Sequence, residues 1–247
     1  MEKDFIFGIH PVMEALDAGK TFDKVFVQNG LLGDNIREVK MKLSQAGIHI
    51  KYVPVEKLNR LTRKNHQGIC AFLSPVQFYS IEDLIPQFFD EGKMPFILVL
   101  DHLTDVRNFG AICRTAEITG VDAIVIPDEG TAPINSDSIK TSAGAIFNLK
   151  ICKEKNLLKV LEYLKLSGIK TICATEKTEQ LIYEEELALP IAIIMGNEEK
   201  GISRDLLKNT DAKLKLPMLG KTDSLNVSVA CGVFLYEVVR QNFKSIQ

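Results

Sequence analysis

The sequence predicts an α/β protein whose C-terminal part is a mainly parallel sheet with helices on both faces, preceded by a small α/β domain. Short apolar runs recur at 96–100, 123–126, 171–174 and 191–195, with helical periodicity between them. Strands buried on both faces of a parallel sheet have such continuous apolar sequences, and alternating strands and helices give helices on both faces. The composition, 247 residues of which 46% are hydrophobic, is that of a globular protein.

The first third of the chain predicts a compact module of its own. Runs rich in β-formers at 24–27 and 49–53 alternate with helical periodicity at 11–16 and 35–46. The module ends near Ser74, and a mixture of turn residues, acids and aromatics follows it, which is typical of a linker with room for a short helix. The predicted parts are a first domain at 1–76, a linker at 77–93 and a larger domain at 94–247.

Charge is divided unequally between these parts. The whole chain has a formal net charge of −2, but residues 1–76 carry eleven Lys or Arg against eight Asp or Glu, a net of +3, which leaves −5 for the remainder. The segment 57–66 has four basic residues and no acid. Such a segment is a footprint for phosphate groups, although it is also typical of a solvated helix face.

Membrane, secreted and metal-binding classes are not expected. The longest apolar runs, 95–100 and 191–195, are far shorter than the ~20 residues of a membrane span, and the N-terminal residues lack the apolar stretch of a signal peptide. The five cysteines lie at least 21 positions apart and form no C-x-x-C. We therefore expect reduced thiols, no metal and a cytoplasmic location.

The last part of the chain predicts three further helices, at 109–119, 157–166 and 225–241. The third is apolar over most of its circumference, so we expect it to be buried in a core or a subunit interface. In open parallel sheets, ligands bind outside the carboxyl ends of the strands. Polar clusters that directly follow strands are therefore the candidates for a site.

The first polar cluster contains the spacing N-x-G-x-x-x-R, formed by Asn108, Gly110 and Arg114 after the strand at 96–100. Asn108 suits a helix N-cap, Gly110 permits close approach of another backbone, and Arg114 is expected on the first turns of the helix. The alternative interpretation is a capped helix with a surface arginine.

Two more clusters follow later strands. The segment 195–201, MGNEEKG, has the glycine spacing of a phosphate loop, but Glu198 and Glu199 would repel a triphosphate and no Lys-Ser/Thr follows, so ATP binding is not expected. The segment 214–230 contains a strand that we expect to end at Pro217, then a loop and the sequence SLNVSVA. Ser and Asn at the start of a helix are also ordinary caps.

These three clusters, in this order, resemble the three signature motifs of the SpoU (TrmH) family of RNA ribose 2′-O-methyltransferases in the SPOUT superfamily. The resemblance covers about 94–242, and the third motif matches literally over seven residues. The opening FGIHPVMEAL and the HQG at 66–68 resemble, more loosely, the small RNA-binding domain of members that act on large-subunit ribosomal RNA.

The resemblance implies a deep trefoil knot at the C-terminal end, which is an exception to the rule that chains avoid knots. It also implies S-adenosylmethionine as cofactor and a homodimer in which the terminal helix packs against its two-fold mate. The cofactor contacts that it implies are Thr175, Gly196, Asn197, Gly201, Leu216, Met218 and Leu225.

The resemblance further implies catalytic roles for Arg114, Asn108, Glu198, Ser224 and Asn226. Family members are described with the arginine as general base, but arginine stays protonated in proteins and a base works best with a pKa near the working pH. We therefore expect Arg114 to hold the adjacent phosphate and stabilise the developing alkoxide. Orientation should supply most of the acceleration.

RNA methyl transfer needs a module that grips the RNA backbone, so the basic segment of the first domain is expected to bind RNA. Its predicted contacts are Arg60, Arg63, Lys64, His66 and Gln67. Ribosomal RNA, with a guanosine as the modified nucleotide, is favoured over transfer RNA.

Two rival functions belong to other classes. A non-catalytic RNA-binding or assembly factor of the same fold would fail to bind S-adenosylmethionine. A nucleotide-dependent oxidoreductase would need G-x-G-x-x-G after a strand, which the sequence lacks.

Overall fold

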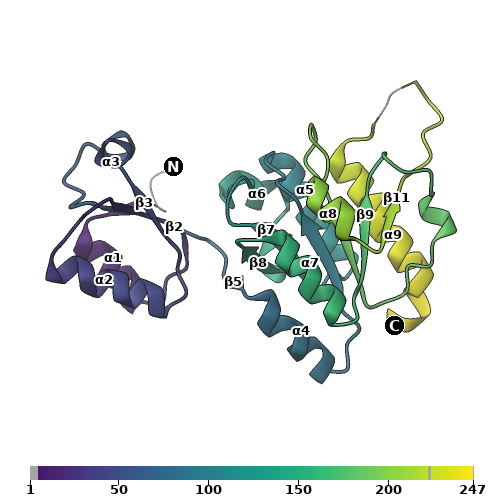
Figure 1. Cartoon of the computed structure of the whole chain (residues 1–247), viewed down its shortest axis with the longest axis horizontal. Coiled ribbons are helices and arrows are strands. Elements are labelled where there is room, and N and C mark those ends of the chain that lie inside the picture. Colours follow the sequence, from purple (N-terminus) through teal and green to yellow (C-terminus); the bar gives the residue numbers. More distant parts are fainter. Residues whose placement is uncertain (1–4, 222–223, 247) are drawn as a thin grey trace. The chain divides into compact units, whose positions relative to one another are not determined.

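The computed structural model describes residues 5–221 and 224–246. The chain forms two compact units, Met1–Gln77 and Phe78–Gln247 (Figure 1). Within the described residues, no helix is both long and apolar enough to cross a bilayer.

The first unit is a four-stranded mixed sheet with helices on both faces (Figure 1). Its strands, in the order β1-β4-β2-β3, are β1 (Phe5–Phe7), β4 (Ile69–Leu73), β2 (Phe22–Gln28) and β3 (Ile50–Val53). Its helices are α1 (Ile9–Asp17), α2 (Asp34–Gln45) and α3 (Val55–Leu61). Apolar side chains of α1 and α2 form one core with the sheet, and Leu58 of α3 packs on the other face.

The second unit is a seven-stranded sheet in which every strand pair is parallel. In spatial order its strands are β11 (Ala212–Leu214), β9 (Lys170–Ala174), β10 (Ile191–Met195), β6 (Phe96–Leu100), β7 (Ala123–Pro127), β8 (Lys150–Glu154) and β5 (Phe78–Tyr79). The chain passes from β6 to β7 and β8 on one side, and later places β10, β9 and β11 on the other. The crevice outside the carboxyl ends near this reversal is where such sheets bind ligands.

Helices cover both faces of this sheet. On one face lie α4 (Ile81–Asp90), α7 (Leu157–Leu166) and α8 (Arg204–Asn209). The other helices are α5 (Val106–Ile118), α6 (Ser136–Thr141) and α9 (Val227–Ile246), with short 3-10 turns at Ala145–Asn148 and Ile182–Glu184. Helix α5 packs against both α6 and α9, and α9 also contacts β10. The fold is therefore the predicted α/β class with a parallel sheet.

The segment interpreted as a linker, 77–93, contains β5 and α4 and belongs to the second unit. β5 pairs with β8. Four residues of α4 at helical spacing, Ile81, Leu84, Ile85 and Phe88, are buried in the core under α7. The mixture of turn residues, acids and aromatics in this segment predicted a linker with room for a short helix, and the structure forms a helix of ten residues there. Pro86 cannot donate to the Glu82 carbonyl, and the Tyr163 hydroxyl donates to that carbonyl instead at 3.1 Å.

Candidate functional site

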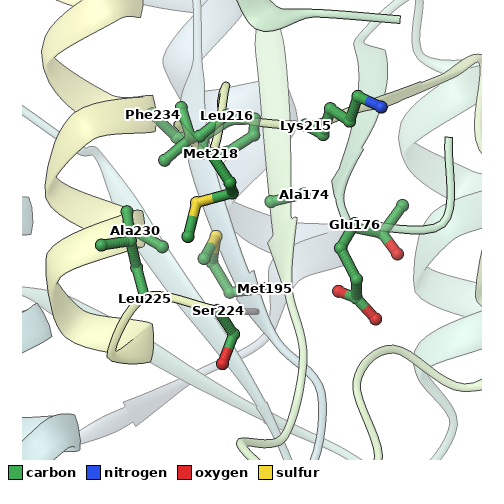
Figure 2. A pocket seen from close by; sticks show the side chains of 11 residues that line it. Ala174, Glu176, Met195, Lys215, Leu216, Met218, Ser224, Leu225, Ala230 and Phe234 are labelled. Carbon is green, nitrogen blue, oxygen red and sulfur yellow. The ribbon is translucent and has the colours of Figure 1, made fainter. Parts of the chain in front are cut away.

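A cavity of about 300 Å³ lies at the carboxyl ends of β9, β10 and β11, beside the first turns of α9 (Figure 2). This volume is at the lower end of the usual range for small-molecule sites. Its lining comprises Ala174, Thr175, Glu176, Met195, Lys215, Leu216, Met218, Ser224, Leu225, Ala230 and Phe234. The strand topology therefore brings the third polar cluster to the residues that follow β9.

The lining combines an apolar wall with a polar one. Figure 2 shows the thioethers of Met195 and Met218 close together on the side of Leu225, while Glu176 lies across the cavity. Glu176 is exposed, and the neighbouring Lys215 ammonium is 2.8 Å from Glu179. Such a site can take a molecule that has a flat apolar part and several polar groups.

The strand ends also offer backbone groups to a ligand. The Thr175 amide donates to the Leu214 carbonyl at 2.9 Å, and its hydroxyl accepts from the Lys177 amide, so the β9 turn is fixed against β11. Within the described residues, the Leu216 backbone makes no hydrogen bond although it borders the cavity. A ligand with a heterocyclic edge would satisfy the amide and carbonyl of Leu216.

A chain of side-chain amides connects the three motifs. Asn226 Nδ2 donates to Asn108 Oδ1 at 3.0 Å, and Asn108 Nδ2 donates to Glu198 Oε1 at 3.0 Å. Asn226 Oδ1 in turn accepts from the amide and hydroxyl of Ser228 at 2.9 and 2.6 Å. Residues up to 118 positions apart are thus joined next to the cavity, and their amide orientations are fixed by their neighbours.

The second motif forms a tight loop after β10. The backbones of Asn197 and Gly201 exchange hydrogen bonds at 3.1 and 2.9 Å, and a Cβ at Gly196 would lie 2.3 Å from the Gly201 carbonyl carbon. Asn197 Oδ1 accepts from the amides of Glu199 and Lys200, while its Nδ2 donates to the His102 carbonyl. Three residues predicted as cofactor contacts, Gly196, Asn197 and Gly201, therefore shape the loop and are not among the residues that line the cavity.

A buried carboxylate that the sequence analysis did not single out anchors the same loop. Asp101 is 2% exposed; its Oδ2 accepts from the Ser203 amide at 2.6 Å and its Oδ1 pairs with His102 Nδ1 at 2.6 Å. It thereby ties the end of β6 to the residues that follow Gly201. In the sequence, the signal for a role of Asp101 was its position directly after an apolar strand.

Helix α5 corrects two local expectations. Its N-cap is Asp105, whose carboxylate accepts from the Asn108 amide at 2.7 Å, so Asn108 lies inside the helix with its side chain free for the amide chain. Arg114 lies on the third turn, exposed, and no described residue pairs with it. Gly110 does permit close approach, since a Cβ there would lie 2.8 Å from the Ser138 carbonyl of α6.

In the first unit, two predicted RNA contacts have structural roles. Gln67 Oε1 accepts from the Ile9 amide at 2.9 Å and so caps α1, which has no cap of its own. His66 is 9% exposed and bonds to Asn59 and to the Gly68 amide. The remaining candidates, Arg60, Arg63 and Lys64, are exposed at and after the end of α3.

The cysteines are poor nucleophile candidates. All five are buried, and burial raises the pKa of Cys173 and Cys231 to about 12, so both are thiols at neutral pH. Among the described residues there is no group of three or more His, Cys, Asp and Glu side chains placed to hold a metal ion.

This is an α/β protein with a small-molecule site at the ends of its strands. The site consists of the cavity at the carboxyl edge of the parallel sheet and the chain of side-chain amides beside it. The model of the SpoU rRNA Methylase family matches residues 95–236, and that of RNA 2′-O ribose methyltransferase substrate binding matches residues 5–79. The chain therefore belongs to the SpoU rRNA methylase family of RNA methyltransferases.

A curated relative agrees with this assignment, and solved structures share the fold. A Staphylococcus saprophyticus protein named as a TrmH family tRNA/rRNA methyltransferase is 33% identical over 98% of this chain and 97% of its own length. An AdoMet-bound rRNA methyltransferase from Sinorhizobium meliloti is 23% identical, with a TM-score of 0.62 over 96% of this chain and 87% of that one. A structure titled RNA 2′-O ribose methyltransferase is 26% identical, with a TM-score of 0.57 over 97% and 88%.

Proposed function

We propose that this protein transfers a methyl group from S-adenosylmethionine to the 2′-hydroxyl of a ribose in ribosomal RNA, with guanosine as the modified nucleotide, in the cytoplasm. The observation that carries the proposal is the chain from Asn226 through Asn108 to Glu198 beside a cavity lined by Ser224 and Leu225. Three separated motifs meet where a cofactor and a sugar would react.

The cavity fits the proposed cofactor. S-adenosylmethionine supplies an electrophilic methyl group on a sulfonium. Leu216, Met218 and Leu225 would hold its flat base by apolar contact and through the Leu216 backbone, and Thr175 borders the same space. The Glu176 carboxylate is placed to accept hydrogen bonds from sugar hydroxyls.

The protein's own residues would position the RNA. Arg114, exposed and without a partner among the described residues, is available to bind the phosphate next to the target ribose in a bidentate manner. Asn108 and Asn226 have fixed amide orientations, so they can orient the sugar without reorganising. In this scheme the arginine stabilises the developing alkoxide, and a neighbouring group or water takes the proton.

We further propose that the active form is a homodimer with a knotted C-terminal end. Helix α9 exposes Val229, Tyr236 and Phe243, and a hollow next to them is bordered by Tyr183 and Arg240. An isologous pair of such faces would bury this apolar surface. Sedimentation of the purified chain tests the dimer, with a monomer at micromolar concentration as the contradicting result.

Ribosomal RNA is favoured because the first unit matches a substrate-binding model and carries a net charge of +3. Transfer RNA is the second candidate substrate, since the staphylococcal relative is named for both RNAs. A non-catalytic assembly factor of the same fold is the third possibility; titration calorimetry with S-adenosylmethionine tests it, and absent heat would support the factor.

The decisive experiment maps ribose methylation in total RNA from cells with and without this gene. We expect one ribosomal guanosine to lose its 2′-O-methyl group. A change in transfer RNA alone would refute the ribosomal assignment. In the purified protein, Arg114→Lys keeps the charge but loses the planar fork, so it should abolish most turnover with cofactor affinity nearly unchanged; full turnover would refute the bidentate role.

A further inference from the structure

The two faces of the sheet in the first unit are covered unequally. Helices α1 and α2 lie against one face, and the short α3 lies against the other (Figure 1). On the α3 side, Phe5, Phe7 and Phe72 are only partly buried, although each packs against the small cluster under α3. We call this surface the aromatic face; it comprises Phe5, Phe7, Phe26 and Phe72 together with Lys24 and Lys51.

Strand register arranges these side chains in two rows across the sheet. Phe5 pairs with Phe72 and Phe72 pairs with Lys24, because a bulge between Phe22 and Lys24 shifts the register of β2. In the second row, Phe7 pairs with Cys70, Cys70 with Phe26, and Phe26 with Lys51. Directly paired residues share a face of the sheet. Each row therefore begins with phenylalanine on the edge strand β1 and ends with lysine.

The rings form one continuous surface. The ring centroids of Phe5 and Phe72 are 4.9 Å apart, those of Phe5 and Phe7 are 5.8 Å apart, and Phe26 meets Phe72 edge-on at 6.3 Å. The ammonium of Lys57, on α3, lies 4.9 Å from the Phe26 ring centre. Basic residues thus border the aromatic surface on the α3 side.

Partly exposed rings beside a row of ammonium groups have the chemistry that binds single-stranded nucleic acid. Bases stack on aromatic faces without regard to sequence, while lysines follow the phosphates. Lys24 lies 3.9 Å from Asp23, and both side chains are partly exposed, so this pair is weak and the ammonium can still contact a phosphate. A protein partner that buried this surface would have to desolvate Lys24 and Lys51, which is unfavourable unless the partner supplies acids of its own. The basic residues Arg60 and Arg63 continue from α3, so a bound strand would meet further positive charge.

We propose that the aromatic face is a stacking platform for a single-stranded segment of the RNA substrate, an inference that rests on the proposed action on RNA. The bases lie on Phe5, Phe7 and Phe72, and the backbone runs along Lys24 and Lys51. This gives the substrate-binding unit a contact surface on the sheet itself, in addition to the basic segment 57–66.

The chain contains no tryptophan, so one introduced tryptophan reports on one site. In the full-length Phe72→Trp variant, a 12-nucleotide oligouridine should quench the fluorescence, because a stacked base lies against the indole. Tyr52→Trp is the matched control: Tyr52 is on β3 but faces α2, where Lys40 lies 5.4 Å from its ring. Equal quenching of both variants, or quenching of neither, would overturn the proposal.

Affinity measurements test the rings and the lysines separately. The double variant with Phe5→Leu and Phe72→Leu keeps apolar packing but removes the stacking surface. It should weaken oligouridine binding at least about five-fold for each ring removed. The control with Phe5→Tyr and Phe72→Tyr keeps both rings and should bind as tightly as the wild type. Replacing Lys24 and Lys51 by glutamine should lower the slope of log affinity against log salt by about 1.4, and Arg37→Gln on α2 should leave it unchanged. Thermal unfolding confirms that each variant is folded.

The outcomes separate this proposal from the proposed function. If the wild type methylates RNA but the ring variants bind oligouridine as tightly as it does, the platform is refuted and the function stands. If the Phe72→Trp signal and the ring effects are present but no methyl transfer is found, the function is refuted and the platform stands. Equal binding of a hairpin duplex in ring variants and wild type, with no preference for the single strand, also refutes the platform.

Discussion

The amide chain at the site makes a sharp prediction about Asn108. In Asn108→Asp, an oxygen replaces the Nδ2 that donates to Glu198 Oε1 at 3.0 Å, while the oxygen that accepts from Asn226 remains. Two carboxylate oxygens at that distance repel by about 1.4 kcal/mol at the dielectric constant of water and by about 5.5 kcal/mol at an effective value near 20. Because Glu198 is exposed, the lower figure applies.

The lost hydrogen bond adds about 0.5–1.5 kcal/mol to this repulsion. We therefore expect a total of about 2 kcal/mol, or about a thirty-fold loss of kcat/KM for methyl transfer. Glu198→Gln in the Asn108→Asp background restores a donor opposite the new carboxylate and should recover most of this loss. Glu199→Gln removes the same charge one residue away and should recover none.

The assay is a double-mutant cycle on kcat/KM, with urea unfolding as a check on the fold. A coupling energy above about 1 kcal/mol between positions 108 and 198 supports the hydrogen bond. If the two substitutions are additive within about 0.5 kcal/mol, the residues do not interact and the amide chain is refuted.

Three other predictions concern packing and ionisation. Gly196→Ala should destabilise the protein by about 2–4 kcal/mol in urea unfolding, since a Cβ there meets the Gly201 backbone at 2.3 Å; wild-type stability would contradict this. Burial raises the pKa of Asp122, which accepts from the Phe96 amide, so its neutral form favours the fold at low pH. Stability of the wild type relative to Asp122→Asn should then fall as pH rises through that raised pKa, and a pH-independent difference in urea midpoints would refute it. Cys173 and Cys231, with pKa values of about 12, should resist iodoacetamide at pH 8 until the protein is denatured, as mass spectrometry of the native protein can check.

Sequence alone determined the fold class because buried parallel strands are short, continuous apolar runs. The predicted runs at 96–100 and 191–195 coincide with β6 and β10. Short strands were harder to predict: β5 has only two residues and escaped notice, and the strand expected to end at Pro217 is the three-residue β11, which ends at Leu214. For 77–93, predicted as a linker with room for a short helix, the signal for α4 was the spacing of its apolar residues and not its composition.

The resemblance carried by the motifs supplied the candidate residues of the site, but the place of each residue relative to the cavity was decided by tertiary structure. Leu216, Met218 and Leu225 border the cavity, whereas Gly196 and Asn197 build a loop beside it. Sequence separation carries no information about which carbonyl a glycine must approach or which amide an asparagine meets. Those contacts exist only once β6 and β10 end, and α9 begins, at one edge of the sheet, because hydrogen bonds act over about 3 Å.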